Sequence, residues 1–404
     1  MPTATTARKT TPAARTAAPA RTRNRNAGHD ESAAATWTCI GLCVQAKVPV
    51  MLWGDPAIGK SAQVERLPQL LSSVSKVIST SVANRENVDF NGVINVRADG
   101  FSTYSAFTWV EELTADAVDG AAPLWFIDEV STGDASVQKA LLRPIQERMI
   151  GDTAISSDVA IVLAGNDPAV AADGSYLEPP LANRCSHFEL TLDRAGWLNG
   201  LLSGFAESTP PVDLTVFAAD PRVNYAQAAY IVSSYLESSP NLINPQVPTE
   251  PKHSSKAWAS GRSWHNLTRV LAHLELVEDN AAYVTALAKA FIGDGAKEFG
   301  DHFVSCLVYD LPKVFSGEQV VKWRTEKHNI SRSLVNAIAR LGCGGDTDMW
   351  EAAEDLMVDA YDSGRQDLAA AGLVKLYSSI PEGAHSTPEA KKIAAELDDM
   401  VTLV

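Results

Sequence analysis

Residues 54–61 read G-D-P-A-I-G-K-S, and this stretch decides the fold of the chain. It matches the pattern G-x-x-x-x-G-K-[ST], which wraps phosphate groups when a buried strand precedes it and a helix follows it. The apolar run at residues 48–53 supplies the strand, and a helix is expected from Lys60 onward. The sequence therefore predicts an α/β sheet with a phosphate loop at the carboxyl end of one strand.

The residue types in this loop suit contact with a nucleotide. Two glycines allow the backbone to turn its amide N–H groups toward phosphate oxygens, and the start of the next helix adds its positive end. Lys60 is expected to reach the β- and γ-phosphates of ATP, and Ser61 to offer a hydroxyl to Mg²⁺. The expected nucleotide-binding residues of the loop are Gly54, Asp55, Pro56, Ala57, Ile58, Gly59, Lys60, Ser61 and Ala62.

A second apolar run, L-W-F-I at residues 124–127, ends in Asp128 and Glu129. Carboxylates at the carboxyl end of a buried strand lie at the sheet edge where ligands bind. We expect Asp128 to bind the nucleotide and, with Ser61, its Mg²⁺, and Glu129 to polarise the attacking water. In isolation the run would fit a strand ending in solvated acids, but the upstream phosphate loop favours the catalytic interpretation.

A third apolar run, at residues 159–164, is followed by G-N-D-P. This tetrapeptide is in itself a turn signal. Because the strand before it is expected in the same parallel sheet, Asn166 is predicted to lie beside the two carboxylates. There its amide would orient the attacking water.

Size and composition are those of a globular protein with more than one domain. The chain has 404 residues, 46% of them apolar and 21% charged, and no apolar run approaches the roughly 18 to 20 residues that span a bilayer. Its five cysteines are scattered and include no C-x-x-C pair, so neither a disulfide framework nor a zinc site is indicated. A cytoplasmic location is expected.

The charge is unevenly distributed. Residues 1–29 contain six of the 34 Lys and Arg residues and no acid, so the remainder has 28 basic and 49 acidic residues, a net charge of −21. An acidic body argues against nucleic acid as the main partner unless a local basic channel exists. Residues 1–31 are expected to be a disordered basic tail, although a transit peptide or a tether to a partner would have a similar composition.

Apolar patterns divide the rest of the chain into three parts. Short strand-like runs alternate with helical patterns over residues 32–190, which is typical of a parallel sheet with crossover helices. Residues 191–310 are expected to form a helical lid domain, and residues 311–404 a helical C-terminal extension. Helices are predicted at residues 32–45, 194–205, 225–237, 263–276 and 281–292, and near 320–341, 347–371 and 388–403, with a long connection at 238–260.

The motifs together resemble those of MoxR-family AAA+ ATPases over residues 53–190. Beyond the loop, the similar segments are V-D-F-N-G at 88–92, D-E-V at 128–130, V-Q-K-A-L-L at 137–142, Q-E-R at 146–148, G-N-D-P at 165–168 and P-L-A-N-R at 180–184. The resemblance implies a three-layer AAA+ domain, an ATPase activity and a homo-oligomeric ring, usually a hexamer, with ATP between neighbours. It also implies a protein client, often one with a von Willebrand factor A-domain. No membrane partner is expected, because no apolar run is long enough to span a bilayer.

The same resemblance assigns roles to individual residues. Asn166 is similar to sensor 1, and Arg184 resembles the arginine finger that reaches the ATP of the next subunit. Residues 259–264, A-S-G-R-S-W, look like the sensor 2 segment, so Arg262 would contact phosphates from the lid of its own subunit. Arg269, seven residues further on, is an alternative for that role.

Four further features of residues 53–190 bear on the resemblance or on the predicted helices. Ala57 stands where a glycine is usual in the phosphate loop, and Asn183 where an aspartate usually precedes the finger arginine. Residues 92–113 are where the family inserts a hairpin that faces the pore. Pro144 is expected to end or kink its helix near Arg143. The aromatic residues available to the hairpin region are Phe101, Tyr104, Phe107 and Trp109.

These observations favour an ATP-hydrolysing ring that remodels a partner protein. Two alternatives remain: a nucleotide-gated scaffold with little hydrolysis, and a motor stimulated by nucleic acid through the basic tail. GTP is disfavoured as the substrate because no N-K-x-D motif follows the loop.

Overall fold

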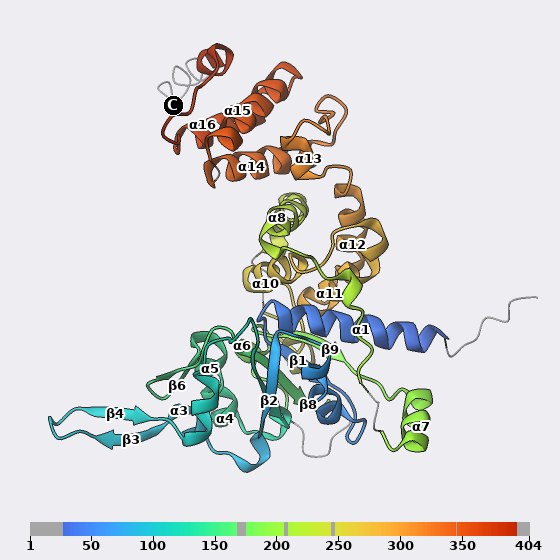
Figure 1. Ribbon diagram of the computed structural model, residues 1–404, viewed down its shortest axis with the longest axis vertical. Coiled ribbons are helices and arrows are strands. Elements are labelled where there is room, and N and C mark those ends of the chain that lie inside the picture. The colour runs from blue at the N-terminus through green and yellow to red at the C-terminus, as the bar shows by residue number, and fades with distance from the viewer. Residues whose placement is uncertain (1–26, 168–174, 206–208, 244–246, 345, 394–404) are drawn as a thin grey trace, which may run out of the picture.

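The computed structural model describes residues 27–167, 175–205, 209–243, 247–344 and 346–393. An α/β domain lies at one end, a layer of helices crosses the middle, and a helical bundle lies at the other end (Figure 1). The predicted basic tail falls largely outside the described residues. Its last part does not, because helix α1 begins at Ala27 and runs to Gln45.

The α/β domain is built on one five-stranded parallel sheet, in the order β2-β5-β8-β1-β9. In register, Val50 of β1 lies between Val162 of β8 and Ser186 of β9. Because parallel strands are covered on both faces, β1 and β8 are buried along their whole length. The strands are β1 (Val50–Trp53), β2 (Val74–Ser81), β5 (Ala122–Asp128), β8 (Ala160–Gly165) and β9 (Ser186–Glu189).

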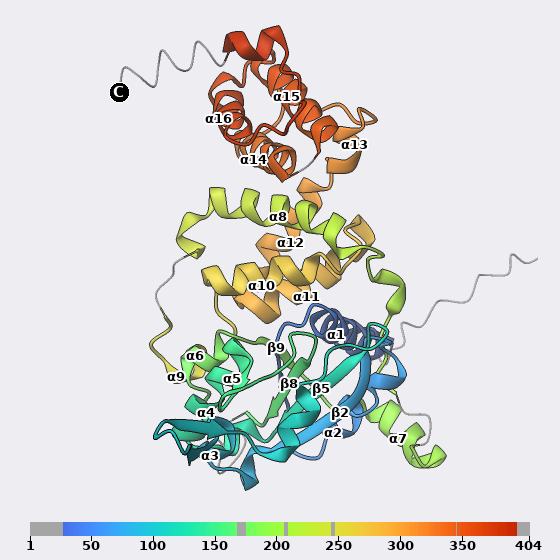
Figure 2. The same cartoon turned by 60° about the vertical axis from the view of Figure 1, so that its left-hand side comes forward.

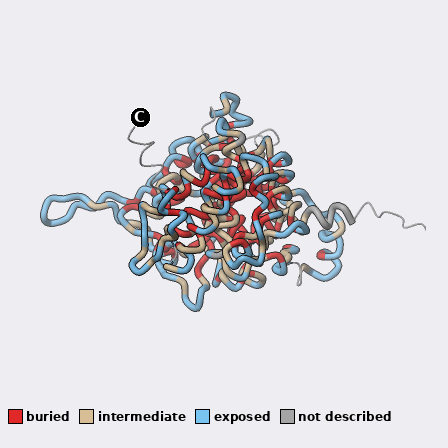
Figure 3. The backbone as a smooth tube through the Cα atoms, turned by 90° about the horizontal axis from the view of Figure 1, so that it is seen from above, coloured by how far each residue is buried: buried red, intermediate tan, exposed pale blue. Residues whose placement is uncertain are grey.

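Alternate residues of the strands face two separate cores. In β1, Val50 and Leu52 face the core that includes α1 and the helical part, whereas Met51 and Trp53 face the core beneath α4 and α5. The predicted α/β fold, with helices on both faces of a parallel sheet and a helical part after it, is confirmed. Seen from above in Figure 3, the buried residues gather in the middle of the molecule. The helices of this domain are α2 (Lys60–Val64), α3 (Asn87–Asn91), α4 (Ala135–Ala140), α5 (Leu142–Glu147) and α6 (Pro179–Ala182).

Helices α8, α10 and α11 form the middle layer, and α14 of the terminal bundle packs on α8 (Figure 2). Within the described residues, no helix is both long and apolar enough to cross a bilayer. The helices are α7 (Arg194–Ser203), α8 (Pro221–Ser238), α9 (Pro251–Ser254), α10 (Gly261–Leu271), α11 (Ala281–Ile292), α12 (Ala296–Cys306), α13 (Leu311–Phe315), α14 (His328–Gly344), α15 (Thr347–Asp362) and α16 (Gln366–Tyr377).

Several helix predictions need correction. The helix expected near 320–341 begins only at His328 and runs to Gly344, because residues 320–327 form turns and irregular chain. The single helix expected at 347–371 is two helices, because Gly364 between them has a φ of 91°, which ends a right-handed helix. The break expected near Arg143 falls earlier, at Leu141 between α4 and α5. Pro144 is the third residue of α5, where a missing N–H leaves no helical hydrogen bond unmade. Of the helix expected near 388–403, residues 388–393 are helical and the rest lies outside the described residues.

An antiparallel hairpin of β3 (Val93–Val96) and β4 (Ser102–Ser105) projects from the α/β domain (Figure 1). Its Phe101 is 72% exposed and Tyr104 is also exposed, whereas Phe107 and Trp109 are half-buried. The ring of Trp109 lies 5.7 Å from that of Trp125. The expected aromatic residues therefore divide between the exposed hairpin and the core. A second, short hairpin is formed by β6 (Met149–Ile150) and β7 (Thr153–Ala154).

A buried carboxylate ties the C-terminal segment to the bundle. Glu354 of α15 is 1% exposed and accepts hydrogen bonds from the Tyr377 hydroxyl (2.7 Å), the Ser386 hydroxyl (2.5 Å) and the Thr387 N–H (2.8 Å). Three donors in a nearly dry site thus share one acceptor group.

Glu354→Ala is expected to lower the free energy of unfolding by about 1 to 3 kcal/mol, because it leaves three half-buried donors without their shared acceptor. Urea unfolding of this variant beside Glu382→Ala, which removes an exposed carboxylate, measures the difference. Equal losses in the two variants would contradict a stabilising role for the buried network.

Candidate functional site

The phosphate loop connects β1 to α2 in a tight turn. A Cβ on Gly54 would lie 2.6 Å from the Ile58 Cδ1 and 2.7 Å from the Leu190 carbonyl oxygen, so no side chain fits there. Gly59 has a φ of 89°, and Ala57 has a φ of 65°. Ala57 therefore holds the left-handed conformation that suits the glycine of the family pattern, at a cost of roughly 1 to 2 kcal/mol.

Lys60 lies at the centre of the site. Its Nζ donates to the carbonyl oxygens of Gly54 (2.8 Å) and Asp55 (3.0 Å) and to Oδ1 of Asn166 (2.8 Å). These bonds use all three hydrogens of the ammonium group. Burial lowers the pKa of Lys60, and Asp128 opposes that shift. The loop thus holds a cation against the end of β8.

Ser61 and Asp128 meet across the mouth of the loop. The Ser61 Oγ donates to Asp128 Oδ2 at 2.6 Å, and Asp128 Oδ1 accepts the N–H of Glu129 at 2.8 Å. A hydroxyl and a carboxylate are oxygen ligands of the kind that Mg²⁺ prefers. The two residues predicted to hold the ion are adjacent and fit it.

Glu129 has a φ of 58° and so stands in the left-handed region. Strained conformations of non-glycine residues gather at functional sites. Its Oε2 accepts a hydrogen bond from the Ser81 Oγ at 2.7 Å. Ser81 ends β2 at the same sheet edge and was not predicted, although its position after a strand-like run is a signal for it.

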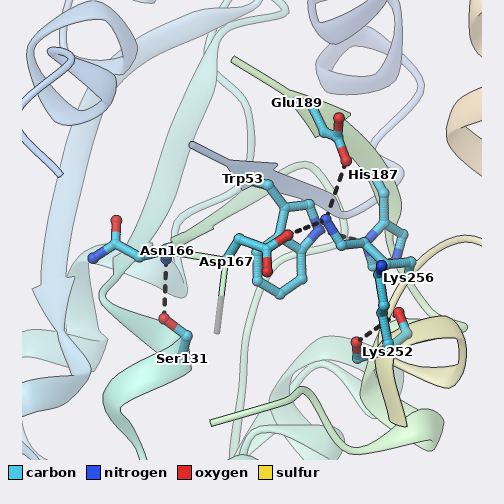
Figure 4. Close-up of polar contacts among 9 residues, drawn as sticks. Trp53, Ser131, Asn166, Asp167, His187, Glu189, Lys252 and Lys256 are labelled. Atoms are coloured by element: carbon cyan, nitrogen blue, oxygen red, sulfur yellow. Dashed lines mark hydrogen bonds and ion pairs between the residues drawn. The ribbon is translucent and has the colours of Figure 1, made fainter. Parts of the chain in front are cut away.

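Asn166 completes this group. Its backbone N–H donates to the Ser131 Oγ at 3.0 Å, and its side chain accepts from Lys60. Figure 4 shows Asn166 beside Ser131 at the end of β8. Lys60, Ser61, Asp128, Glu129 and Asn166 therefore lie together at the carboxyl edge of the sheet, as predicted.

Lys256, which follows α9, extends the site into the helical part. Its Nζ lies 2.9 Å from Asp167 Oδ2, 3.1 Å from Glu189 Oε1 and 4.8 Å from the centre of the Trp53 ring (Figure 4). Sequence reasoning missed this residue, because its partners belong to three other segments. The lysine fastens the helical part to the carboxyl ends of β1, β8 and β9.

A cleft of about 1440 Å³ opens between the α/β domain and the helical part, beside the phosphate loop. Among the described residues, its lining contains more basic than acidic side chains, although the folded body is strongly acidic. The basic ones are Lys60, Arg194, Lys252, Lys256, Lys289 and Lys297, and the acidic ones are Asp167, Glu189, Asp193, Asp294 and Glu298. The excess is a single positive charge, so the lining is close to neutral.

His187 of β9 lies buried at the wall of this cleft. Its Nδ1 accepts from the Trp53 indole N–H at 2.9 Å, and its Nε2 pairs with the Ala182 carbonyl oxygen at 2.9 Å. Burial lowers the pKa of His187 from 6.5 to about 4. Between these values the unfolded chain binds a proton that the folded chain does not.

The free energy of unfolding is therefore expected to fall as the pH drops from 6.5 toward 4, by up to about 1.4 kcal/mol per pH unit for this one proton. Urea unfolding at several pH values, compared with His187→Gln, isolates the contribution, because glutamine keeps a donor and an acceptor but does not titrate. His273 also has a pKa lowered by burial to about 4, and it is present in both proteins. Identical pH slopes would contradict the assignment.

Arg184 lies at the opposite edge of the sheet from the loop. It comes just before β9, whose first residue, Ser186, pairs with the first residue of β1. Its guanidinium donates to Gln146 of α5 and to the Pro180 carbonyl oxygen. Burial and then the neighbouring Arg262 lower the pKa of Arg184. The two arginines predicted from the family pattern are thus neighbours of each other.

Arg262 is not among the described residues that line the cleft. It lies beside Arg184, which precedes β9 at the amino edge of the sheet, whereas the resemblance implies contact with the phosphates of its own chain. Arg269 is held elsewhere as well, because its guanidinium donates to the Ala46 carbonyl oxygen at 2.7 Å, just beyond the end of α1. There it neutralises the negative end of that helix, at the amino edge of the sheet.

No protein-family model matches the chain, and no curated protein matches it. Among solved structures it is similar to a candidate ATPase from Cytophaga hutchinsonii, with 16% identity and a TM-score of 0.35, over 68% of this chain and 84% of that one. It is also similar to a full-length MCM homolog from Methanopyrus kandleri, with 14% identity and a TM-score of 0.30, over 71% of this chain and 63% of that one. The chain itself has an α/β domain on a five-stranded parallel sheet, with a phosphate loop after β1, followed by a helical part.

Proposed function

We propose that the chain is an ATP-hydrolysing AAA+ protein of MoxR type that works as a homo-oligomer. The observation that carries the proposal is a group of polar side chains at one edge of the sheet. Three hydrogen bonds join them in pairs, namely Lys60 to Asn166, Ser61 to Asp128, and Ser81 to Glu129. Phosphoryl transfer to water needs these parts: a cation for the phosphates, ligands for a metal ion and a carboxylate that orients the water.

ATP would bind with its phosphates in the loop and the rest of the molecule in the cleft. The ammonium group of Lys60 would exchange protein oxygens for phosphate oxygens on binding. Mg²⁺, held by Ser61 and Asp128, would neutralise charge on the transferred phosphate. Glu129, held by Ser81, would accept the hydrogen bond of the attacking water, and the Asn166 amide would orient it.

A second copy of the chain would complete the site. Arg184 and Arg262 lie at the amino edge of the sheet, whereas Lys60 lies at the carboxyl edge. This separation supports a contact in which these arginines face the ATP of a neighbour. The separation therefore favours an ATP site formed by two neighbouring subunits. The family resemblance implies that these subunits form a hexameric ring. A same-chain contact of Arg262 with ATP is not supported.

The client would be a protein. The projecting hairpin exposes several apolar side chains, namely Val93, Ile94, Val96 and Phe101. Exposed apolar side chains on a projecting hairpin suit contact with another protein, and the acidic body disfavours nucleic acid. The resemblance extends this to a von Willebrand factor A-domain protein, with the chain acting as its chaperone or remodeller.

Calorimetric titration of ATP with Mg²⁺ tests the nucleotide site. Lys60→Met is expected to raise the Kd by about 30-fold or more, since losing a buried charge contact costs roughly 2 to 5 kcal/mol. Lys139→Met, which removes an exposed lysine from α4, is expected to leave the Kd unchanged. Equal affinities in both variants would overturn the assignment.

Particle mass and turnover in ATP then separate the alternatives. Assembly with turnover supports the proposal, and assembly without turnover would identify a scaffold. Stimulation by single-stranded DNA or RNA would identify a nucleic-acid motor.

A further inference from the structure

A short segment spans the two edges of the sheet. Residues 256–260, here called the connector, join α9 to α10 and run beside β9, and α9 itself lies beside α6 (Figure 2). Lys256 at its start contacts Glu189, the last residue of β9. Ser260 at its end contacts Asn183, which lies three residues before β9 begins at Ser186. The connector therefore reaches from the carboxyl edge to the amino edge.

At the carboxyl edge the connector contacts the phosphate site through one residue. Lys256 pairs with Asp167 at 2.9 Å, and Asp167 directly follows Asn166, the acceptor for Lys60. Lys256 is three-quarters buried, with 24% of its side chain exposed, so the ion pair is partly shielded from water. Lys60 contacts Asn166, and Lys256 contacts the next residue, Asp167. A change in the hydrogen bonds of Lys60 therefore acts next to the ion pair of Lys256.

At the amino edge the connector is held by a buried amide. Asn183 is 8% exposed, and its Nδ2 donates to the Trp258 carbonyl oxygen at 3.3 Å while its Oδ1 accepts from the Ser260 Oγ at 2.8 Å. An ionised aspartate, the usual residue in the family pattern, accepts hydrogen bonds but donates none. The departure at Asn183 therefore creates a contact that the usual residue lacks.

Each contact at this edge adjoins an arginine. Arg184 follows Asn183 in the chain, and Ser260 is the N-cap of α10, whose second residue is Arg262. A displacement of Ser260 would move the start of α10 and the segment before β9 together, because the amide binds both. The positions of the two arginines are thus linked through Asn183.

We propose that the connector couples the phosphate site of a subunit to the arginine pair Arg184 and Arg262 that the same subunit offers to its neighbour, with Lys256 and Asn183 as the positioning residues. This inference rests on the proposed function. Phosphate binding withdraws Lys60 from Asn166, the turn at residues 166–167 shifts, and Lys256 carries the shift into the connector. Coupling of this kind is reciprocal, so engagement of the arginines by a neighbour changes the nucleotide affinity of the subunit that supplies them.

Hydrogen exchange with and without a non-hydrolysable ATP analogue tests the coupling in the full-length protein. The analogue is expected to change amide exchange at residues 181–186 and 258–264 of the wild type by about fivefold or more, the lower end of usual site-to-site coupling. Lys256→Met should abolish the change, and Lys256→Arg, which keeps the charge, should retain it. Lys139→Met is the control and should leave the response unchanged, because Lys139 is exposed on α4 and does not line the cleft.

The variant Asn183→Asp tests the contact of the connector at the amino edge of the sheet. Asn183 and Ser260 do not line the cleft, so the analogue should still bind while the response at residues 258–264 is lost. A wild type that fails to bind the analogue overturns the proposed function and the coupling with it. A wild type that binds without a response at these residues overturns the coupling alone, as does an unchanged response in Lys256→Met or Asn183→Asp.

Discussion

Replacement of Glu129 by glutamine is expected to lower ATP turnover by about 10²- to 10⁴-fold, the usual contribution of a positioned general base. The glutamine amide is nearly the same size as the carboxylate and still offers an oxygen to the Ser81 hydroxyl. It cannot accept a proton from water. The substitution therefore removes the base and leaves the loop between β5 and α4 in place.

Phosphate release at saturating ATP measures this effect, and the Kd for ATP measured alongside it should stay within a few-fold of the wild type. Ser81→Ala serves as the graded control. It keeps the carboxylate but frees it to rotate, so a smaller loss is expected than for Glu129→Gln. Equal turnover in the wild type and Glu129→Gln would exclude Glu129 as the base.

Arg184→Ala is expected to lower kcat by about 10³-fold or more, the range for an arginine that neutralises charge on the transferred phosphate. ATP affinity should persist, because Arg184 lies at the opposite edge of the sheet from the loop that binds the phosphates. A large loss in kcat with little change in Kd is the pattern expected of a group that acts on the transition state.

Mixing two inactive variants tests whether the site is shared. Arg184→Ala retains an intact phosphate loop, and Lys60→Met retains an intact arginine. If neighbours share a site, mixed assemblies contain some interfaces with both groups, and turnover returns on mixing. Absence of recovery, with mixed assemblies verified by mass, would show that each chain completes its own site.

The sequence predicted the phosphate site because its parts are local. Gly54 to Ser61 are consecutive, and Asp128, Glu129 and Asn166 each follow an apolar run that marks a strand. Since parallel strands present their carboxyl ends at one edge, proximity follows from fold class alone. Nothing beyond strand recognition was needed for these residues.

The parts that escaped prediction depend on packing between distant segments. Lys256 gains its role from Asp167 and Glu189, at the ends of two different strands. Asn183 was noted only as a departure, and its two partners lie about 75 residues further along the chain. Strand β9 was also missed, because Ser186, His187 and Glu189 leave its four residues without an apolar run.

The hydrogen bonds of Lys60 have a consequence for the release of product. All three of its N–H groups have oxygen partners within the protein, two from the loop and one from Asn166. A phosphate that binds Lys60 must replace these protein oxygens. The net binding free energy from this contact is therefore only the difference between the new hydrogen bonds and the old ones. Under the proposed function that difference would be smaller for ADP, which lacks the γ-phosphate, than for ATP. The side-chain amide of Asn166, the residue after β8, would then favour the release of ADP and shorten the time it stays bound.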